Sequence, residues 1–268
     1  MRIHSTFTKA LAVSAVALMS LTACGGSDSG DADSSAGGNE LGLVQPGTLT
    51  ICSDVPYPPF EFEKDGDYTG FDIDLMRAIS DSMGLELAVQ DVGFDGLQSG
   101  VVLASGQCDV GASAMTITED RKEHLGFTDG YYDSEQSLLV PKDSDIKSIE
   151  DLAGKTVGVQ QGTTGENYTR ENVPSDTEVK AYPSDAELFP ALKSKGVDAV
   201  LQDLPVNLGH QEDGQYVIVE KYKTDEQYGF AVNKEGSEAL LKELDAKLAE
   251  LKDNGKYQEI YDKYFSTK

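Results

Sequence analysis

A single arginine stands among hydroxyl side chains directly after a strand-like run. Residues 114–121 read AMTITEDR and follow the run CDVGASA at 108–114. Thr118 can cap a helix that begins at Glu119, which places Arg121 in the first turn, near unpaired backbone N–H groups. Its guanidinium can pair with both oxygens of a carboxylate, and a phosphate would also suit it. The pattern predicts an anion site at Arg121.

A second set of polar residues lies in the other half of the chain. Gly162, Thr163 and Thr164 form another possible helix start, with small residues that let a ligand approach the backbone. Asp203 and the hydroxyl of Thr116 offer oxygen acceptors for an ammonium group. Enclosing a zwitterion costs several kcal/mol of hydration per charge, by rough estimate, unless both of its ends are paired. These groups together favour a free amino acid as the ligand.

Aromatic residues and a further carboxylate follow the first two predicted strands. Tyr57 and Phe94 could sandwich a ligand side chain, with a cation–π contribution if that side chain is positive. Asp54 directly follows the first strand. Taken singly, such residues are more often ion-pair partners, turn residues or helix caps. Their joint occurrence at strand ends favours a binding site.

Apolar, β-branched runs alternate with helical stretches, which is the pattern of parallel sheets covered by helices. The predicted strands are 48–52, 86–90, 109–114, 156–160, 198–202 and 216–220. Similar segments at 103–113 and 192–203 indicate a repeated unit and hence two α/β lobes. In open parallel sheets, ligands bind beyond the carboxyl ends of the strands, so we expect the site between the lobes.

The charge balance and missing motifs exclude several functions. Lys and Arg total 22 against 47 Asp and Glu, a formal net charge of -25 that repels phosphate backbones. We therefore expect no nucleic-acid partner. The sequence contains no Walker motif, no second apolar span, no visible metal cluster and no nucleophile–base pair. We expect no cofactor or metal, and neither ATP hydrolysis nor transport can reside in this chain.

The N-terminus has the pattern of an export signal. Arg2 and Lys9 precede an apolar stretch at 10–21, which is shorter than the roughly 20 residues of a membrane-spanning helix. LTAC resembles a bacterial lipobox, which implies cleavage after residue 23 and diacylation of Cys24, although a plain signal with an incidental cysteine remains an alternative. The Gly/Ser/Asp-rich stretch at 24–45 is expected to be a flexible tether. The protein should be lipid-anchored on the extracytoplasmic face of the cell membrane.

The two remaining cysteines are expected to be unpaired. If Cys52 and Cys108 lie on neighbouring parallel strands with level C-terminal ends, they are offset by three or four residues along the sheet. At about 3.3 Å per residue that is on the order of 10 Å. A disulfide requires Cα atoms within about 7 Å.

Six segments follow one another in an order that resembles the polar amino-acid-binding proteins of ABC importers, the bacterial extracellular solute-binding proteins of family 3. They are SDVPYPPFEF, GFDIDLMRAI, MTITEDRKEHLGFTDGYY, VGVQQGTTGE, LQDLP and DNGKYQEIYDKYF. The resemblance runs from about residue 46 to the C-terminus. It implies a monomeric extracellular lipoprotein that captures a polar or basic L-amino acid by hinge closure and delivers it to a membrane permease with its ATPase.

The resemblance also implies a fold. This is the type II periplasmic-binding-protein-like architecture, with two Rossmann-like lobes and a ligand cleft between them. Two hinge strands, near 131–135 and 226–230, would join lobe 1 (46–131 with 229–268) to lobe 2 (132–228).

The ligand contacts that the resemblance implies can be assigned to this sequence. The ligand carboxylate would be bound by Arg121 and by the backbone N–H of Thr164, at the helix start that includes Thr163. The ammonium group would be bound by Asp203, Thr116 and the Ala114 carbonyl. The ligand side chain would lie between Tyr57 and Phe94, and its far end would meet Asp54 and Gln160. Relatives that bind basic amino acids often carry Ser where Ala114 stands, and some glutamine binders carry Lys where Gln160 stands. Asp54 should repel an acidic side chain, which leaves glutamine and the basic amino acids ahead of glutamate.

Two other functions use the same fold. An exported dehydratase-like enzyme could employ Glu166 or Asp54 as an acid, although His124 and His210 fall outside the strand ends. A ligand sensor that signals through a membrane partner could use the same pocket.

Overall fold

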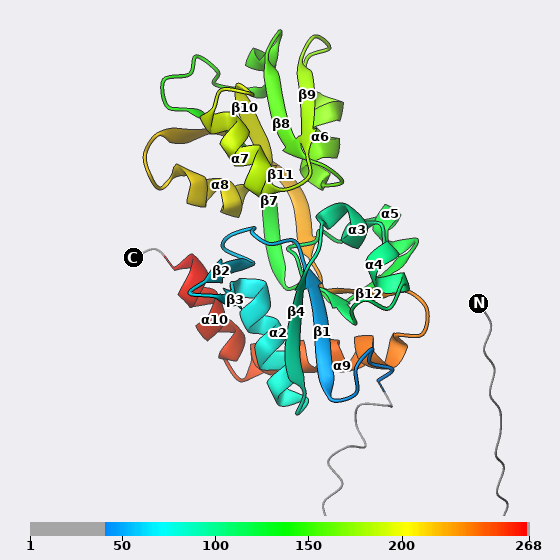
Figure 1. The fold of residues 1–268 in the computed structure, drawn as a ribbon. Coiled ribbons are helices and arrows are strands. Elements are labelled where there is room, and N and C mark those ends of the chain that lie inside the picture. Colours follow the sequence, from blue (N-terminus) through cyan, green and yellow to red (C-terminus); the bar gives the residue numbers. More distant parts are fainter. Residues whose placement is uncertain (1–40, 267–268) are drawn as a thin grey trace, which may run out of the picture. The chain divides into compact units, whose positions relative to one another are not determined.

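The computed structural model describes residues 41–266 (Figure 1). The predicted signal peptide, Cys24 and most of the predicted tether lie outside the described residues. Contacts with the core begin at Leu43, which packs against the first hydrophobic cluster, and the backbone N–H of Val44 donates to Asp109 Oδ1 at 2.7 Å. Among residues 41–266, no helix combines the length and the apolar character that a membrane crossing requires.

The first sheet forms the centre of lobe 1. Its strand order is β4 (Glu86–Asp91), β1 (Thr48–Ser53), β5 (Val110–Gly111), β12 (Ala231–Asn233) and β6 (Leu125–Phe127), and a hairpin of β2 (Phe62–Lys64) and β3 (Asp67–Thr69) lies outside it. β1 pairs in parallel with β4 and β5, and all of its residues are buried. The continuous burial of β1 is typical of a strand covered on both faces.

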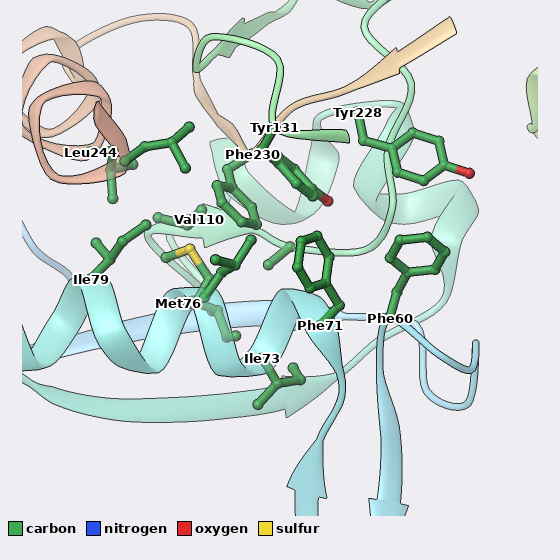
Figure 2. Packing of buried hydrophobic residues seen from close by; sticks show 14 of the residues in the cluster. Phe60, Phe71, Ile73, Met76, Ile79, Val110, Tyr131, Tyr228, Phe230 and Leu244 are labelled. Carbon is green, nitrogen blue, oxygen red and sulfur yellow. The ribbon is translucent and has the colours of Figure 1, made fainter. Parts of the chain in front are cut away.

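The helices of lobe 1 lie around this sheet, and the longer ones cover it with apolar stripes. The helices are α2 (Phe71–Ser82), α3 (Phe94–Gln98), α4 (Val101–Ala104), α5 (Glu119–Lys122), α9 (Glu238–Asp253) and α10 (Lys256–Phe265). Ile73, Met76 and Ile79 of α2 recur at helical spacing and are fully buried. Figure 2 shows Met76 and Ile79 on the side of α2 that faces Val110 of the sheet and Leu244 of α9.

An aromatic cluster joins α2 to the chain segments near the lobe boundary. The Tyr131 and Phe230 rings stack with centroids 4.2 Å apart, and Phe60 meets Tyr228 edge-on at 5.3 Å. Phe71 lies beside them in Figure 2, with its side chain fully buried. These rings exclude water from the region where the hydroxyls of Tyr131 and Tyr228 meet buried carboxyl groups.

The second sheet forms the centre of lobe 2. Its strand order is β11 (Tyr216–Tyr228), β7 (Tyr132–Pro141), β10 (Ala199–Asp203), β8 (Thr156–Gln160) and β9 (Glu178–Tyr182), and its helices are η1 (Ile149–Leu152), α6 (Thr164–Asn172), α7 (Asp185–Lys193) and α8 (Leu204–Gln211). β8 pairs in parallel with β9 and β10, whereas β7 and β11 run antiparallel to their neighbours. Two α/β lobes are therefore present, as predicted.

β7 and β11 include most of the segments 131–135 and 226–230 that were predicted as hinges, and they pair with each other. The register places Tyr132 opposite Tyr228 and Ser134 opposite Glu226. β11 reaches from Tyr216 to Tyr228, so the strand predicted at 216–220 is only its first part. Figure 1 shows the two strands side by side over most of their length. They carry the chain between the two sheets.

The strand predicted at 109–114 is wrong in its extent, because β5 contains only Val110 and Gly111. Ala114 has a φ of 42°, in the left-handed region that an extended strand does not use. The backbone N–H of Ala114 donates to Asp72 Oδ2 at 2.8 Å, a contact that residue spacing along the strand does not reveal. The early end of the strand turns residues 114–116 toward the site described below.

The prediction of two unpaired thiols is also wrong, because Cys52 and Cys108 form a disulfide with a Cα–Cα separation of 5.8 Å. β1 and β5 are indeed parallel neighbours, but Cys108 precedes β5, at a bend that follows α4. Asp109 holds this bend against β1, since its N–H donates to the Thr50 carbonyl and its Oδ2 accepts from the Thr50 N–H at 2.8 Å. The offset counted along the sequence is therefore not a rise along a strand.

Candidate functional site

One pocket brings together all of the residues predicted to contact a ligand. It is lined by Asp54, Tyr57, Phe94, Ser113, Ala114, Thr116, Arg121, Gln160, Thr163, Thr164 and Asp203. The space between them is about 20 Å³, which is room for about one water molecule. Among these residues only Ser113 was not predicted to contact a ligand. The sequence indicated it only through its position next to Ala114.

Arg121 reaches the pocket from the first turn of α5. Thr118 caps this helix as predicted, because its Oγ1 accepts the backbone N–H of Arg121 at 3.2 Å. The guanidinium is not a solvated ion-pair partner, since the residue is only 5% exposed. Nη1 donates to the Thr116 carbonyl at 2.6 Å, Nη2 donates to the Gly162 carbonyl at 3.0 Å, and Cζ lies 5.3 Å from the centre of the Phe94 ring. The guanidinium is thus held at the junction of the two lobes.

Asp203 supplies the opposite charge from the end of β10. It occupies the N-cap position of α8, but its side chain makes no capping hydrogen bond. Instead Oδ2 accepts from the Tyr57 hydroxyl at 3.0 Å and from the Tyr228 hydroxyl, and Oδ1 accepts from Gln136 Nε2 at 2.6 Å. A carboxylate has about four acceptor positions, so three donors leave room for one more. The remaining position suits a hydrogen bond from a ligand ammonium.

Burial changes the pKa values of both charged groups. It raises the pKa of Asp203 to about 6, with a further contribution from Glu226, while the hydrogen bonds from tyrosine and glutamine oppose the rise. Burial lowers the pKa of Arg121 to about 10, and the negative charges of Asp203 and Glu226 oppose that fall. At neutral pH the two groups therefore carry opposite charges in a largely dry pocket.

Asp54 and Gln160 meet at another end of the pocket, one from each lobe. Gln160 Nε2 donates to Asp54 Oδ2 at 2.6 Å. Burial raises the pKa of Asp54 to about 7, the Gln160 hydrogen bond lowers it, and the charges of Asp91 and Asp185 add to the rise. A carboxylate that is 7% exposed and close to its pKa at neutral pH suits a ligand group that donates hydrogen bonds or carries a positive charge.

The start of α6 forms the lobe 2 side of the pocket. Thr163 caps this helix, since its Oγ1 accepts the backbone N–H of Glu166 at 3.1 Å. Glu166 in turn accepts the Gly162 N–H at 2.8 Å and pairs with Arg170 at 2.7 Å. Its carboxylate does not line the pocket. Glu166 therefore stabilises the loop and the helix, rather than standing in the pocket as the acid that a dehydratase would need.

Three polar residues of the hinge strands reach the back of the site and were not predicted to contribute to it. They are Gln136 of β7 and Glu226 and Tyr228 of β11. Glu226 Oε2 accepts from Thr116 Oγ1 and from Thr164 Oγ1, each at 2.9 Å. A sequence signal existed, because strands that pass between two lobes run behind the cleft. The sequence does not indicate which of their side chains face it.

A pair of buried carboxyl groups stands behind Ala114. Asp72 Oδ2 accepts from the Ala114 N–H at 2.8 Å and from the Tyr131 hydroxyl at 2.6 Å, and Glu61 Oε1 accepts from Ser113 Oγ at 2.6 Å. Burial raises the pKa of Asp72 to about 7 and that of Glu61 well above its usual range, with the charge of Asp72 adding to the latter. The pair holds residues 113–114 in place behind the pocket.

The described part of the chain offers no grouping of three His, Cys, Asp or Glu side chains that could hold a metal ion. His210 Nε2 lies 2.9 Å from Asp185 Oδ1, and neither His124 nor His210 lines the pocket. The side chains of the pocket can pair separate positive and negative groups of a ligand.

Comparisons with known proteins find similar sequences and similar structures. The family model of bacterial extracellular solute-binding proteins, family 3, matches residues 49–267. The ABC transporter glutamine-binding protein GlnH of Bacillus subtilis (strain 168) is 35% identical over 259 residues, 94% of each chain. The arginine-binding extracellular protein ArtP of the same organism is 34% identical over 262 residues, 96% of each chain. A solved structure of an ancestral arginine-binding protein bound to glutamine has a TM-score of 0.78 at 38% identity, covering 83% of this chain and 100% of that one.

Proposed function

Because the chain belongs to the bacterial extracellular solute-binding proteins, family 3, we propose that it captures a polar or basic L-amino acid for an ABC importer. The candidates are glutamine, arginine, lysine and histidine. One observation carries the proposal: Arg121 and Asp203, from different lobes, line the same pocket with opposite charges. A free amino acid neutralises both.

Each end of the ligand has its own set of partners in this proposal. Arg121 and the backbone N–H of Thr164 bind the carboxylate. Asp203, the Thr116 hydroxyl and the Ala114 carbonyl bind the ammonium group, while Asp54 and Gln160 meet the end of the side chain. Tyr57 and Phe94, which are 8% and 6% exposed, exclude water from its apolar part. Thr163 supports the pocket as the cap of α6.

Binding is coupled to closure of the two lobes. A ligand can shift an open–closed equilibrium only through contacts that differ between the two states. Arg121 belongs to lobe 1, whereas Thr164 and Asp203 belong to lobe 2, so the full set of contacts forms only on closure. The space between these groups is about 20 Å³, which is less than an amino acid occupies. The lobes therefore part to admit the ligand and close around it at a wider separation than in this arrangement. We place the lobe boundaries at residues 131–132 and 228–229.

The proposal extends to the partners and the location. A lipid anchor at Cys24 would keep the monomeric protein on the extracytoplasmic face, close to a membrane permease and its ATPase. The pocket serves binding and release, not catalysis. A signalling role would use the same ligand contacts and would differ only in the membrane partner.

A thermal-shift screen of the twenty amino acids followed by calorimetry tests the function. We expect stabilisation by glutamine or by one or more basic amino acids, little effect of glutamate, and recovery of the bound amino acid unchanged after prolonged incubation. Absence of binding by every amino acid would defeat the proposal. Chemical conversion of the ligand would establish an enzyme instead.

The raised pKa of Asp54 predicts a pH-dependent preference between ligands. Above pH 7 the carboxylate attracts a guanidinium, and below pH 7 it is neutral and loses that attraction. The affinity for arginine relative to glutamine should therefore fall by up to about thirty-fold between pH 8 and pH 5.5. Calorimetry with both ligands measures this ratio, in which the effect of other titrating groups largely cancels. In Asp54→Asn the ratio should not change with pH, and a pH-dependent ratio in that variant would contradict the assignment.

A further inference from the structure

Glu226 lies directly behind two hydroxyl groups that line the pocket. Its Oε2 is 2.9 Å from Thr116 Oγ1 of lobe 1 and 2.9 Å from Thr164 Oγ1 of lobe 2. Gln136 Nε2 lies 3.3 and 3.2 Å from the two carboxylate oxygens of Glu226. Glu226 itself is not part of the pocket lining. Glu226 therefore meets a ligand through the two threonine hydroxyls, while its charge also acts on Asp203 and Arg121.

The backbone aims Glu226 at this position. The register between β7 and β11 shifts between Tyr222 and Glu226, and Asp225 has a φ of 52°. Such an irregularity bends a strand and redirects the side chains beside it. Asp225 points outward, with its side chain 82% exposed and 3.6 Å from Lys223, whereas Glu226 points to the threonines. Two neighbouring carboxylates on one strand thus have opposite surroundings.

A hydroxyl group has one proton to donate and two lone pairs that accept. A carboxylate can only accept, so Thr116 and Thr164 both direct their protons toward Glu226. The two threonine oxygens, which lie 3.5 Å apart, then offer only lone pairs in other directions. A ligand ammonium finds acceptors there. A ligand carbonyl at the same place would face lone pairs and would find no donor.

We propose that Glu226 is a positioning residue that selects for the α-ammonium group of the ligand, because it holds the hydroxyl protons of Thr116 and Thr164 away from the pocket. This inference rests on the proposed function and adds a specificity element to it. Asp203 attracts the ammonium directly, whereas Glu226 acts through the orientation of the two hydroxyls.

The test compares amino acids with 2-oxo acids that have the same side chain. The probes are L-arginine and L-glutamine, each measured by calorimetry against its 2-oxo acid, in the wild type and in Glu226→Gln. The amide of the variant can donate to the threonine oxygens, which frees the hydroxyl protons for the pocket. We expect the preference for the amino acid over its 2-oxo acid to fall at least tenfold, with unchanged or tighter binding of the 2-oxo acid.

Asp225→Asn is the matched control, because it removes the same charge from the neighbouring residue. The preference of this variant for the amino acid over its 2-oxo acid should stay within twofold of the wild-type value. Thr116→Val/Thr164→Val, which lacks both hydroxyls, separates orientation from charge: adding Glu226→Gln to it should change the preference for the amino acid over its 2-oxo acid by less than twofold, and a further tenfold fall would show that Glu226 acts by its charge alone and would overturn the inference.

The outcomes separate this inference from the proposed function. If Glu226→Gln weakens the amino acid and the 2-oxo acid by the same factor, the residue only supports lobe closure and the inference is wrong. An unchanged preference also overturns it. If the wild type binds neither arginine nor glutamine, nor any other amino acid, the proposed function itself fails.

Discussion

Replacing Arg121 by glutamine is expected to weaken amino-acid binding by about a thousand-fold or more. A guanidinium can make two charge-assisted hydrogen bonds to a ligand carboxylate, each contributing about 1.5–3 kcal/mol. Their loss corresponds to a factor between about 10² and 10⁴ in Kd. The effect should be at the upper end because the site is dry: Arg121 is 5% exposed and lies over the Phe94 ring. Calorimetry with the amino acid found by thermal-shift screening measures the change.

Lys122 provides the control for this prediction. It is the next residue on α5, its side chain is 48% exposed, and it pairs with Glu119 at 2.9 Å at the surface. Lys122→Gln removes the same charge without touching the pocket, so its Kd should stay within about twofold of the wild-type value. Near-normal affinity in Arg121→Gln, with both variants folded, would remove the basis for the carboxylate site.

The second large effect concerns stability. Replacing Cys52 and Cys108 together by alanine should lower the free energy of unfolding by about 4 kcal/mol, because the disulfide closes a loop with a sequence separation of 56 residues. For a protein of this size that corresponds to a fall of roughly 10 °C in Tm. Both cysteines are buried, so the loss of packing adds to the effect. Urea unfolding of the wild type and the double variant measures the difference.

Reduction of the disulfide in the wild type measures the stability that the crosslink contributes, separately from the packing of the two cysteine side chains. Wild-type protein unfolded in urea with a reductant should be less stable than oxidised protein, and the double variant should not respond to the reductant. Thiol labelling of the unfolded, unreduced chain should leave Cys52 and Cys108 unlabelled. Equal stability of the oxidised and reduced wild type would show that the disulfide does not constrain the chain.

Several local features were predictable because they depend on residues a few positions apart. The hydroxyl of Thr118 caps α5 as predicted, and α6 begins at Thr164, within the helix start predicted at residues 162–164. The apolar stripes of α2 and α9 face the core for the same reason, since helical periodicity is a property of the local sequence. The identity of the pocket residues was also accessible, because polar side chains at the ends of parallel strands share one edge of a sheet.

Contacts between distant segments could not be predicted from the local sequence. The bend before β5 brings Cys108 to Cys52, which no strand periodicity indicates. The irregular register of β11 turns Glu226 toward Thr116, 110 residues away, and toward Thr164, 62 residues away. Such contacts depend on small backbone departures from ideal strands, and a one-residue change of register reverses the direction of a side chain.

The sequence by itself determined which residue types stand at the strand ends, and with them the class of ligand that the pocket suits. Only the tertiary structure decided how the two charges are held: Tyr57 meets Asp203 across 146 residues of sequence, and Arg121 meets the Gly162 carbonyl across 41. The physical reason is that residue type and periodicity are local, whereas burial, hydrogen-bond partners and pKa depend on segments that approach only when both lobes have formed.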